Sequence, residues 1–357
     1  MTRLVYTGMM ARGMWQNLKF KTPVGNWISF KDPKFQFMGA YKKSFAIFGI
    51  LALIAVGGMV FRGFSKSIDF TGGRNFVVMF EKQVSAEQAN ALLENAFEGS
   101  NINAIALGTD GNTLRISTNY RINEDGVEVD SEIEAKLFEV LKSGGLLADD
   151  LSLETFINRD VRTGGSIISS QKVGPSVAED ITYGAIWSVI LAIIAIFIYI
   201  LVRFRNVAFS IGSIVALVSD VLLILGAYAL LWGIMPFSME IDQTFIGAIL
   251  TAIGYSINDK VVVFDRIREE LGLHPTQSRF DLFNRSVNQT LNRTINTSVS
   301  TFIVLAVIFI IGIVGGGAGS IISFSFAMML GVVFGTFSSI FVAAPTAFLF
   351  LDKKAKK

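Results

Sequence analysis

This chain of 357 residues is strongly apolar: hydrophobic residues make up 52% of it, charged residues only 17%, and the mean hydropathy is +0.54. A soluble globular protein carries about a quarter charged residues, so the composition excludes that class. The chain has no cysteine and one histidine, His274, which excludes disulfides, thiolate metal sites and histidine-rich metal sites. The net charge of +2 says little by itself. No phosphate-binding GxxxxGK motif occurs, so we expect no ATP hydrolysis.

Six windows of the sequence are long and apolar enough to cross a bilayer. The hydrocarbon core, about 30 Å thick, needs about 20 mostly apolar helical residues. The windows cover residues 44–61, 183–202, 207–232, 244–264, 295–314 and 321–351. The last window is long enough for one tilted or bent helix. We therefore predict an α-helical membrane protein with six transmembrane helices.

The basic residues are concentrated in every second connection, which predicts the orientation, because Lys and Arg are retained on the cytoplasmic side. The basic connections are residues 1–43, the loop with Arg203 and Arg205, the loop with Arg266, Arg268, Arg279 and Arg285, and the tail 352–357. The opposite connections are acidic near Glu240 and Asp242, and uncharged at 315–320. We predict that both termini are cytoplasmic and that the long segment 62–182 is extracytoplasmic.

Segment 62–182 has the pattern of an α+β domain. Four β-rich runs cover residues 74–80, 102–107, 113–118 and 153–161, and a turn-rich stretch at 108–112 is suited to a hairpin. Two capping-box patterns, at 85–88 and 131–134, predict helices over 85–97 and 131–141. The order β-α-β-β-α-β predicts a ferredoxin-like fold.

Asp259 is the most informative ionisable residue within a predicted span. Such residues cost roughly +2.5 to 3.5 kcal/mol on insertion scales and are functional candidates by default. The apolar run continues after it through Phe264, so Asp259 lies about 9 Å inside the cytoplasmic end of the fourth span. The alternative is a carboxylate that reaches the lipid headgroups with help from Lys260. We favour a functional carboxylate, because the aspartate side chain is short.

Arg293 is the expected partner of Asp259. It opens the fifth span, which runs antiparallel to the fourth, so both charges fall at a similar depth. Thr297 follows four residues later on the same helical side. Protonation of the carboxylate would break such a pair, which is the physics of a proton-driven switch. The alternatives are a static ion pair, or an arginine that contacts lipid phosphates.

Asp220 lies near the middle of the third span, where a carboxylate is most costly. It either belongs to the same proton relay or is hydrogen-bonded to neighbouring helices, and the sequence does not decide between these. Small residues recur where helices would meet, which predicts close helix packing. They include Gly247, Gly254, Gly331 and Gly335.

Four short segments resemble the SecD/SecF family of protein-export membrane proteins. Just after the first span, Asp69, Phe70, Thr71, Gly72 and Gly73 match its Asp-Phe-Thr-Gly-Gly signature. The run VGPSV, which includes Gly174 and Pro175 at the start of the second span, matches a second element. GYSINDKVVVFDRIRE at 254–269 and SVNQTLNRTINTS at 286–298 are similar to the motifs of the fourth and fifth spans. The resemblance covers about residues 43–351.

The resemblance implies a six-helix membrane domain of the resistance-nodulation-division (RND) type in a bacterial inner membrane. It implies a motor subunit, not an enzyme, that acts with SecD, the SecYEG channel and YajC on unfolded exported polypeptides, with the proton as coupling ion and no other cofactor. No nucleic-acid partner is expected. By the same resemblance, Asp259 is the proton-responsive carboxylate, and Arg293 and Thr297 are its partners. The glycines at 72 and 73 suit either a hinge or a fixed turn.

Residues 1–43 are longer than a separate SecF-type chain needs. They are either the end of a fused SecD half or a basic amphipathic arm. One rival function is an RND-type proton-coupled exporter of small molecules or lipids. A second is a scaffold that stabilises the translocation channel without moving protons.

Overall fold

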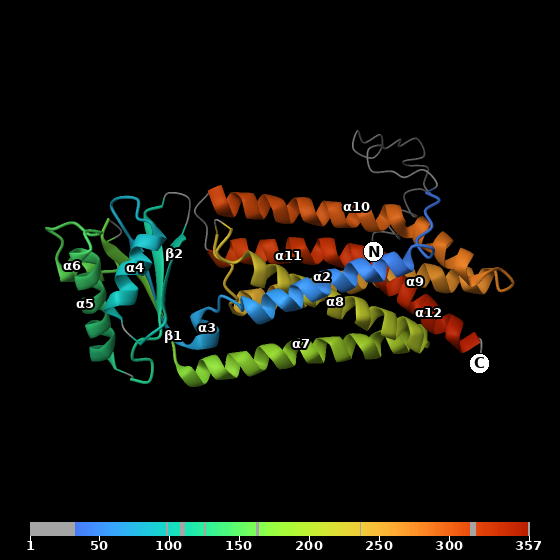
Figure 1. Cartoon of the computed structure of the whole chain (residues 1–357), viewed down its shortest axis with the longest axis horizontal. Helices are drawn as coiled ribbons and strands as arrows, with labels where there is room; N and C mark the ends of the chain where they lie inside the picture. The colour runs from blue at the N-terminus through green and yellow to red at the C-terminus, as the bar shows by residue number, and fades with distance from the viewer. Residues whose placement is uncertain are drawn as a thin grey trace, which may run out of the picture.

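The computed structural model describes residues 33–97, 99–107, 111–124, 126–161, 164–235, 237–314 and 319–355, with the backbone alone beyond residue 351. Long helices run side by side along the molecule, and a smaller domain with a sheet lies at one end of them (Figure 1). The beginning of the first long helix and the end of the last one lie at the other end of the bundle (Figure 1). The predicted arm over 1–32 lies outside the described residues.

Six helical segments among the described residues are long and apolar enough to span a membrane, which confirms the predicted number. They are α2 (Tyr41–Phe61), α7 (Pro175–Phe204), α8 (Val207–Leu231), α9 (Gln243–Leu273), α10 (Arg279–Val314) and a last span (Gly319–Leu351). α7 and α10 begin well before the predicted windows. The expected domain boundary at residue 183 falls inside a continuous helix that begins at Pro175.

The last span is bent, as its length predicted. It consists of α11 (Gly319–Ser338), a π-helical turn η1 (Ser339–Ala343) and α12 (Ala344–Ala355). Pro345 follows the π turn. Its ring cannot donate a backbone hydrogen bond and crowds the carbonyl four residues earlier, so the helix changes its hydrogen-bonding pattern at this point. Figure 1 shows α12 inclined away from the direction of α11.

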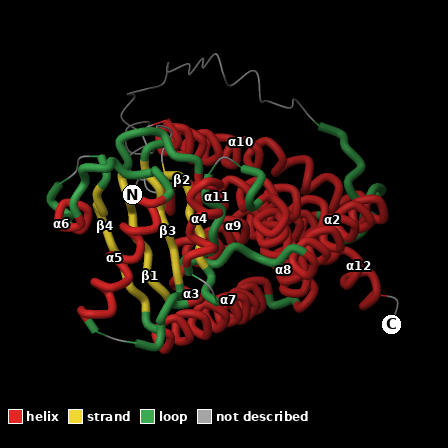
Figure 2. Tube along the Cα trace, turned by 60° about the vertical axis from the view of Figure 1, so that its left-hand side comes forward, coloured by secondary structure: helices red, strands yellow, loops and turns green. Residues whose placement is uncertain are grey.

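The smaller domain has the ferredoxin-like order that the sequence predicted. Its elements are α3 (Ile68–Thr71), β1 (Gly73–Met79), α4 (Ala86–Ala96), β2 (Ile102–Leu107), β3 (Thr113–Thr118), α5 (Val127–Ser143), α6 (Leu153–Ile157) and β4 (Ser166–Val173). The four strands form an antiparallel sheet in the order β2-β3-β1-β4. Figures 1 and 2 show α4 and α5 on one side of the sheet, so the other face is turned toward the helical bundle.

Two local predictions in this domain are wrong. Residues 153–157 form the short helix α6 instead of the last strand, because the Ser152 side chain accepts a hydrogen bond from the Thr155 amide and caps a helix there. The last strand is β4. The helix predicted from residue 131 begins at Val127, and the Ser131 hydroxyl donates to the Val127 carbonyl within the helix instead of capping it.

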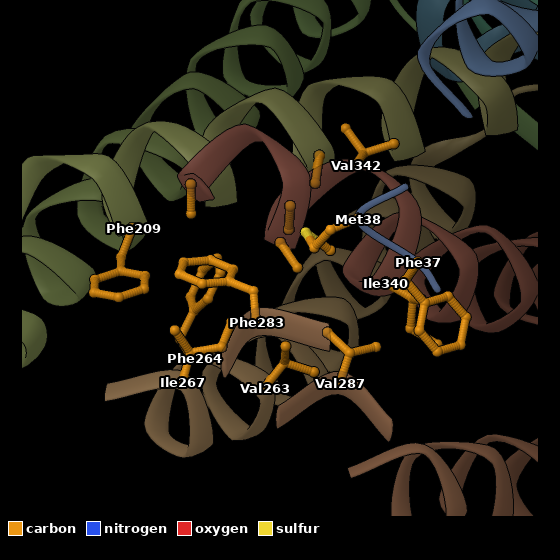
Figure 3. Packing of buried hydrophobic residues seen from close by; sticks show 14 of the residues in the cluster. Phe37, Met38, Phe209, Val263, Phe264, Ile267, Phe283, Val287, Ile340 and Val342 are labelled. Atoms are coloured by element: carbon orange, nitrogen blue, oxygen red, sulfur yellow. The ribbon is translucent and has the colours of Figure 1, made fainter. Parts of the chain in front are cut away.

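The segment before α2 is packed against the bundle. Phe37 and Met38 lie in a buried cluster with side chains from α9, α10 and the π turn, among them Val263 and Ile340 (Figure 3). The Met38 amide donates to Asn284 Oδ1 at 2.8 Å. The last residues of the predicted basic arm are therefore part of the folded membrane domain.

Candidate functional site

A buried ion pair joins α8 to α9 in the interior of the bundle. Lys260 Nζ lies 2.9 Å from Asp220 Oδ2, and the two residues are 0% and 3% exposed. The hydroxyl of Ser256, one turn before Lys260, donates to the same Asp220 oxygen at 2.7 Å and also contacts Lys260 Nζ. Ser256 and Lys260 share one side of α9 because they are four residues apart. Asp220 is thus bound by two groups of α9.

Asp259 faces a different set of groups. It is 3% exposed, and its Oδ2 accepts a long hydrogen bond, 3.4 Å, from the Ser298 hydroxyl of α10. Ser298 is also 2.6 Å from the Thr336 hydroxyl of α11, which donates to the Val332 carbonyl. The Ser298 proton can therefore point either to Asp259 or to Thr336. The hydrogen-bonding partner of Asp259 among the described residues is one neutral hydroxyl, that of Ser298.

The expected ion pair between Asp259 and Arg293 is not formed, and in this respect the sequence prediction is wrong. Arg293 is exposed, and the Thr297 hydroxyl donates to the Arg293 carbonyl at 2.9 Å. Arg293 and Ser298 are five residues apart, which places them about 140° apart around a helix. Because Ser298 is the residue of α10 that faces Asp259, Arg293 points to another side. The two residues lie at a similar depth but face different directions around their helices.

Lys260 is the functional candidate that the sequence reasoning missed. The sequence suggested Lys260 only as a group that could help the Asp259 carboxylate to reach the lipid headgroups. The signal that could have found it is a lysine in an apolar run of one span and an aspartate near the middle of another, each costly in a bilayer unless paired.

Two of the four predicted packing glycines are required within the chain. A Cβ on Gly331 would lie 2.5 Å from the Ala252 Cβ, and a Cβ on Gly335 would lie 2.7 Å from the Ser256 hydroxyl. α11 therefore approaches α9 closely beside the polar groups, as small residues permit. Gly247 and Gly254 have no atom within 4 Å of such a position, so they make no close helix contact within the described chain.

We expect Gly335→Ala to destabilise the bundle by about 1–3 kcal/mol, the usual effect of overpacking, because the added methyl group displaces Ser256 from Asp220. The measurement is the thermal unfolding midpoint in detergent. Gly254→Ala is the matched control and should leave the midpoint unchanged or raised, since its methyl group meets open space. Equal midpoints for the two variants would contradict the close approach of α11 to α9.

Polar and small residues also occur on the exposed sides of α9 and α10. On α9 they are Gly247, Thr251, Gly254 and Asn258, and on α10 they are Gln289, Arg293, Asn296 and Ser300. The α9 residues are spaced by three or four, so they form one stripe on the helix. Lipid-facing positions of a membrane helix are normally apolar, so these two stripes are the surfaces of the bundle best suited to another protein.

The Asp-Phe-Thr-Gly-Gly segment lies where the small domain meets the bundle. Asp69 Oδ2 accepts a hydrogen bond from the Gln243 amide, the first residue of α9, at 3.1 Å. Backbone bonds tie the same region together: Ser67 N–H donates to Ile241 and Ile241 N–H donates to Ser65. Asp69 therefore holds the N-terminus of the helix that carries Asp259 and Lys260, where a carboxylate is also favoured by the helix dipole.

The two glycines of this segment are needed for its backbone. Gly72 has φ 68° and Gly73 has φ 136°, and a Cβ on Gly73 would lie 2.4 Å from the Thr118 carbonyl oxygen. Phe70 is half-buried, and the Thr71 hydroxyl donates to the Ser67 carbonyl. These contacts favour a fixed turn over a free hinge.

At the start of the second span, Gly174 is the N-cap of α7 and Pro175 is its first residue, a position where the missing amide hydrogen of proline costs nothing. Ile68 of α3 packs with Val173 and Ala178 on either side of this start. The Asp-Phe-Thr-Gly-Gly segment and the beginning of α7 are thus one packed unit.

A second ion pair connects the sheet to the loop between α8 and α9. The Arg115 guanidinium of β3 contacts the carboxylate of Glu240 and the Ser238 hydroxyl. Burial raises the pKa of Glu240 despite the attraction of Arg115. Burial likewise raises the pKa of Asp242 in the same loop.

The raised pKa of Glu240 predicts a pH dependence of stability. The folded protein binds this proton more tightly than the unfolded chain, so the contribution of Glu240 to stability grows as the pH falls through its raised folded-state pKa and is lost as the pH rises through it. The Glu240→Gln variant lacks this titratable carboxyl group. The unfolding midpoint of the native chain should therefore rise relative to that of Glu240→Gln as the pH falls. A difference that is independent of pH would contradict this prediction.

Comparison with known proteins agrees with the motifs. The family model "Protein export membrane protein SecD/SecF, C-terminal" matches residues 155–353, and the "SecD/SecF GG Motif" model matches residues 57–84. The chain belongs to the SecD/SecF family. The second model covers Asp69 to Gly73, so the resemblance noted for that segment is confirmed.

Curated members of the SecD/SecF family match most of this chain. The protein translocase subunit SecF of Rhodothermus marinus is 37% identical over 317 residues, which cover 88% of this chain and 93% of the relative. SecF of Haemophilus influenzae is 32% identical and covers 90% of this chain and 88% of the relative. This SecD/SecF family member is therefore a multi-pass membrane subunit of the protein-translocase type.

SecDF proteins that join two halves are also similar. The chain is 33% identical to protein translocase subunit SecDF of Thermus thermophilus, and it spans 38% of that relative. The crystal structure of the Thermus thermophilus SecDF superposes with a TM-score of 0.72 at 29% identity, over 99% of this chain and 42% of the other. These matches confirm the fold and support an association with SecD.

Proposed function

We propose that this chain is the SecF-type subunit of a proton-driven protein translocase, which uses the proton motive force to assist late stages of polypeptide passage through SecYEG. In this proposal the chain is a motor subunit whose coupling ion is the proton. The relatives named translocase subunits support it over an exporter of small molecules.

The observation that carries the proposal is the course of α9. This helix begins at the Asp69 carboxylate beside the small domain and contains Asp259 and Lys260 farther along. Sixteen residues separate Gln243 from Asp259, about 24 Å of helix. A change of charge at Asp259 can therefore shift a rigid element that ends at the junction with the small domain.

Asp259 is suited to carry the coupling proton. Its hydrogen-bonding neighbour is a neutral hydroxyl that has an alternative acceptor in Thr336. An ionised carboxylate in this setting favours the approach of a cation, while a protonated carboxylate does not. We propose that Arg293 moves toward Asp259 when the carboxylate is ionised and away from it when the carboxylate is protonated.

SecD is the proposed partner on the exposed stripes of α9 and α10. A second six-helix half would cover Gly254 and Asn258 and would bury the Arg293 side chain. Small residues allow close approach of helices, and polar residues bond across them. Burial of Arg293 at this interface would strengthen its attraction to Asp259.

From the basic connections we propose that both termini lie in the cytoplasm of a bacterial cell and the small domain outside its inner membrane. In that orientation the small domain meets polypeptide that emerges from SecYEG, and YajC would be a further membrane partner. Unfolded polypeptide is the proposed cargo.

The test uses membrane vesicles that contain SecYEG and SecD but lack this chain. Adding the native chain should stimulate export of a preprotein, and collapsing the proton gradient with a protonophore should remove the stimulation while ATP is present. Stimulation that survives the protonophore would favour the rival function, a scaffold that moves no protons.

A further inference from the structure

We infer that Lys260 and Asp220 form a permanent ion pair that fixes α8 to α9 and keeps Asp220 out of the proton path, so that Asp259 alone carries the coupling proton. This inference rests on the proposed function. It assigns different roles to Asp220 and Asp259, the carboxylates within the third and fourth membrane spans. It also assigns Lys260 as a positioning residue.

The first observation is the separation of the two hydrogen-bonded groups. Asp220, Ser256 and Lys260 form one group between α8 and α9. Asp259, Ser298 and Thr336 form another between α9, α10 and α11. No hydrogen bond joins the two groups in the described parts of the bundle, although Asp259 and Lys260 are adjacent in sequence. Consecutive helical residues point about 100° apart, so the two side chains leave α9 in different directions.

The second observation is the difference in charge balance. Asp220 has a cation and a hydroxyl on one oxygen, and both charges of this pair are almost completely buried. Its other oxygen, Oδ1, is buried and accepts no bond from the described residues. Asp259 has no ion pair within 4.0 Å among the same residues. An ammonium at hydrogen-bond distance favours the ionised form of a carboxylate, and a neutral hydroxyl provides no such opposite charge.

The third observation is the packing that holds the pair in place. Ser256 is pressed against α11 at Gly335, where there is no room for a Cβ. No ionisable side chain of α11 or α10 contacts the pair in the described structure, so Lys260 has no competing carboxylate except its sequence neighbour Asp259. Lys260 is therefore fixed toward α8.

The experiment compares single and double substitutions in the vesicle assay with SecD and SecYEG. Lys260→Met leaves a buried charge unpaired and should strongly reduce the amount of assembled chain. The double variant Asp220→Leu/Lys260→Met replaces the pair by apolar groups, and Asp220→Lys/Lys260→Asp exchanges the two charges. At least one double variant should recover native assembly and export within about twofold of native, since a buried pair is often replaceable as a unit.

The pH dependence of export distinguishes the inferred role of the ion pair from a purely structural role, which would leave that dependence unchanged. Export by the native chain and by the apolar double variant should change with pH in a single titration step. The residual export of Lys260→Met should show a second titration step, from Asp220 without its partner. Normal assembly of both double variants without export would overturn the inference, as would failure of both to assemble.

Asp259→Asn, in the same assay, tests the proposed function separately: if it exports normally, the proposed function fails whatever the double variants do.

Discussion

Asp259→Asn is expected to reduce gradient-dependent export to the level of vesicles without this chain. The substitution keeps the shape of the side chain and its hydrogen bond with Ser298, but it removes the only buried carboxylate of the bundle, among the described residues, that has no ion-pair partner. An amide cannot bind and release a proton in this pH range. The measurement is preprotein export in the presence and absence of the gradient, with the amount of chain bound to SecD measured in parallel.

Glu269→Gln is the matched control. It neutralises another carboxylate of α9, which is exposed and pairs with Arg266 one turn away. Surface ion pairs of this kind contribute about 0–1 kcal/mol, so export should remain close to native. Equal losses in the two variants would show that the helix is sensitive to any change of charge, and the special role of Asp259 would be wrong.

Gly254→Trp is expected to prevent association with SecD. Within the chain its side chain meets open space on the exposed stripe of α9, so folding of the isolated subunit should be unaffected. At a close helix–helix contact the large ring would separate the helices. We expect recovery of SecD in co-purification to fall at least about tenfold, equivalent to about 1.4 kcal/mol of lost association free energy.

Gly184→Trp provides the comparison for this surface. Gly184 is also exposed and also has open space around its Cβ position, but it lies on α7. Its substitution should leave SecD recovery unchanged. Loss of SecD with Gly184→Trp and normal recovery with Gly254→Trp would place the partner on α7 instead of α9.

The sequence was sufficient for the number of spans and for the strand order of the small domain. Hydrophobic windows of span length allow only helices in a bilayer, and the hairpin strands 102–107 and 113–118 were recovered with their observed bounds. The last strand was misplaced because Ser152 caps a helix over residues that are rich enough in apolar groups to resemble a strand.

The arrangement of charges inside the bundle was only partly predictable. Depth in the membrane follows from position along a span, so the burial of Asp259 and Asp220 was expected. Which helix each residue faces depends on rotation of the helix about its axis, and that is set by packing such as the contact of Gly335 with Ser256. For this reason the buried ion pair joins Lys260 to Asp220, while Arg293 is exposed.

The most direct measurement of the central claim is a distance between the small domain and the bundle as the charge of Asp259 changes. The chain contains no cysteine, so two exposed positions, Val127 on α5 and Ile234 beside α8, can be replaced by cysteine and spin-labelled. With SecD bound, we expect the distance distribution between the labels to differ between the native chain and Asp259→Asn, and to be unchanged in Glu269→Gln. Identical distributions in all three proteins would contradict coupling through α9.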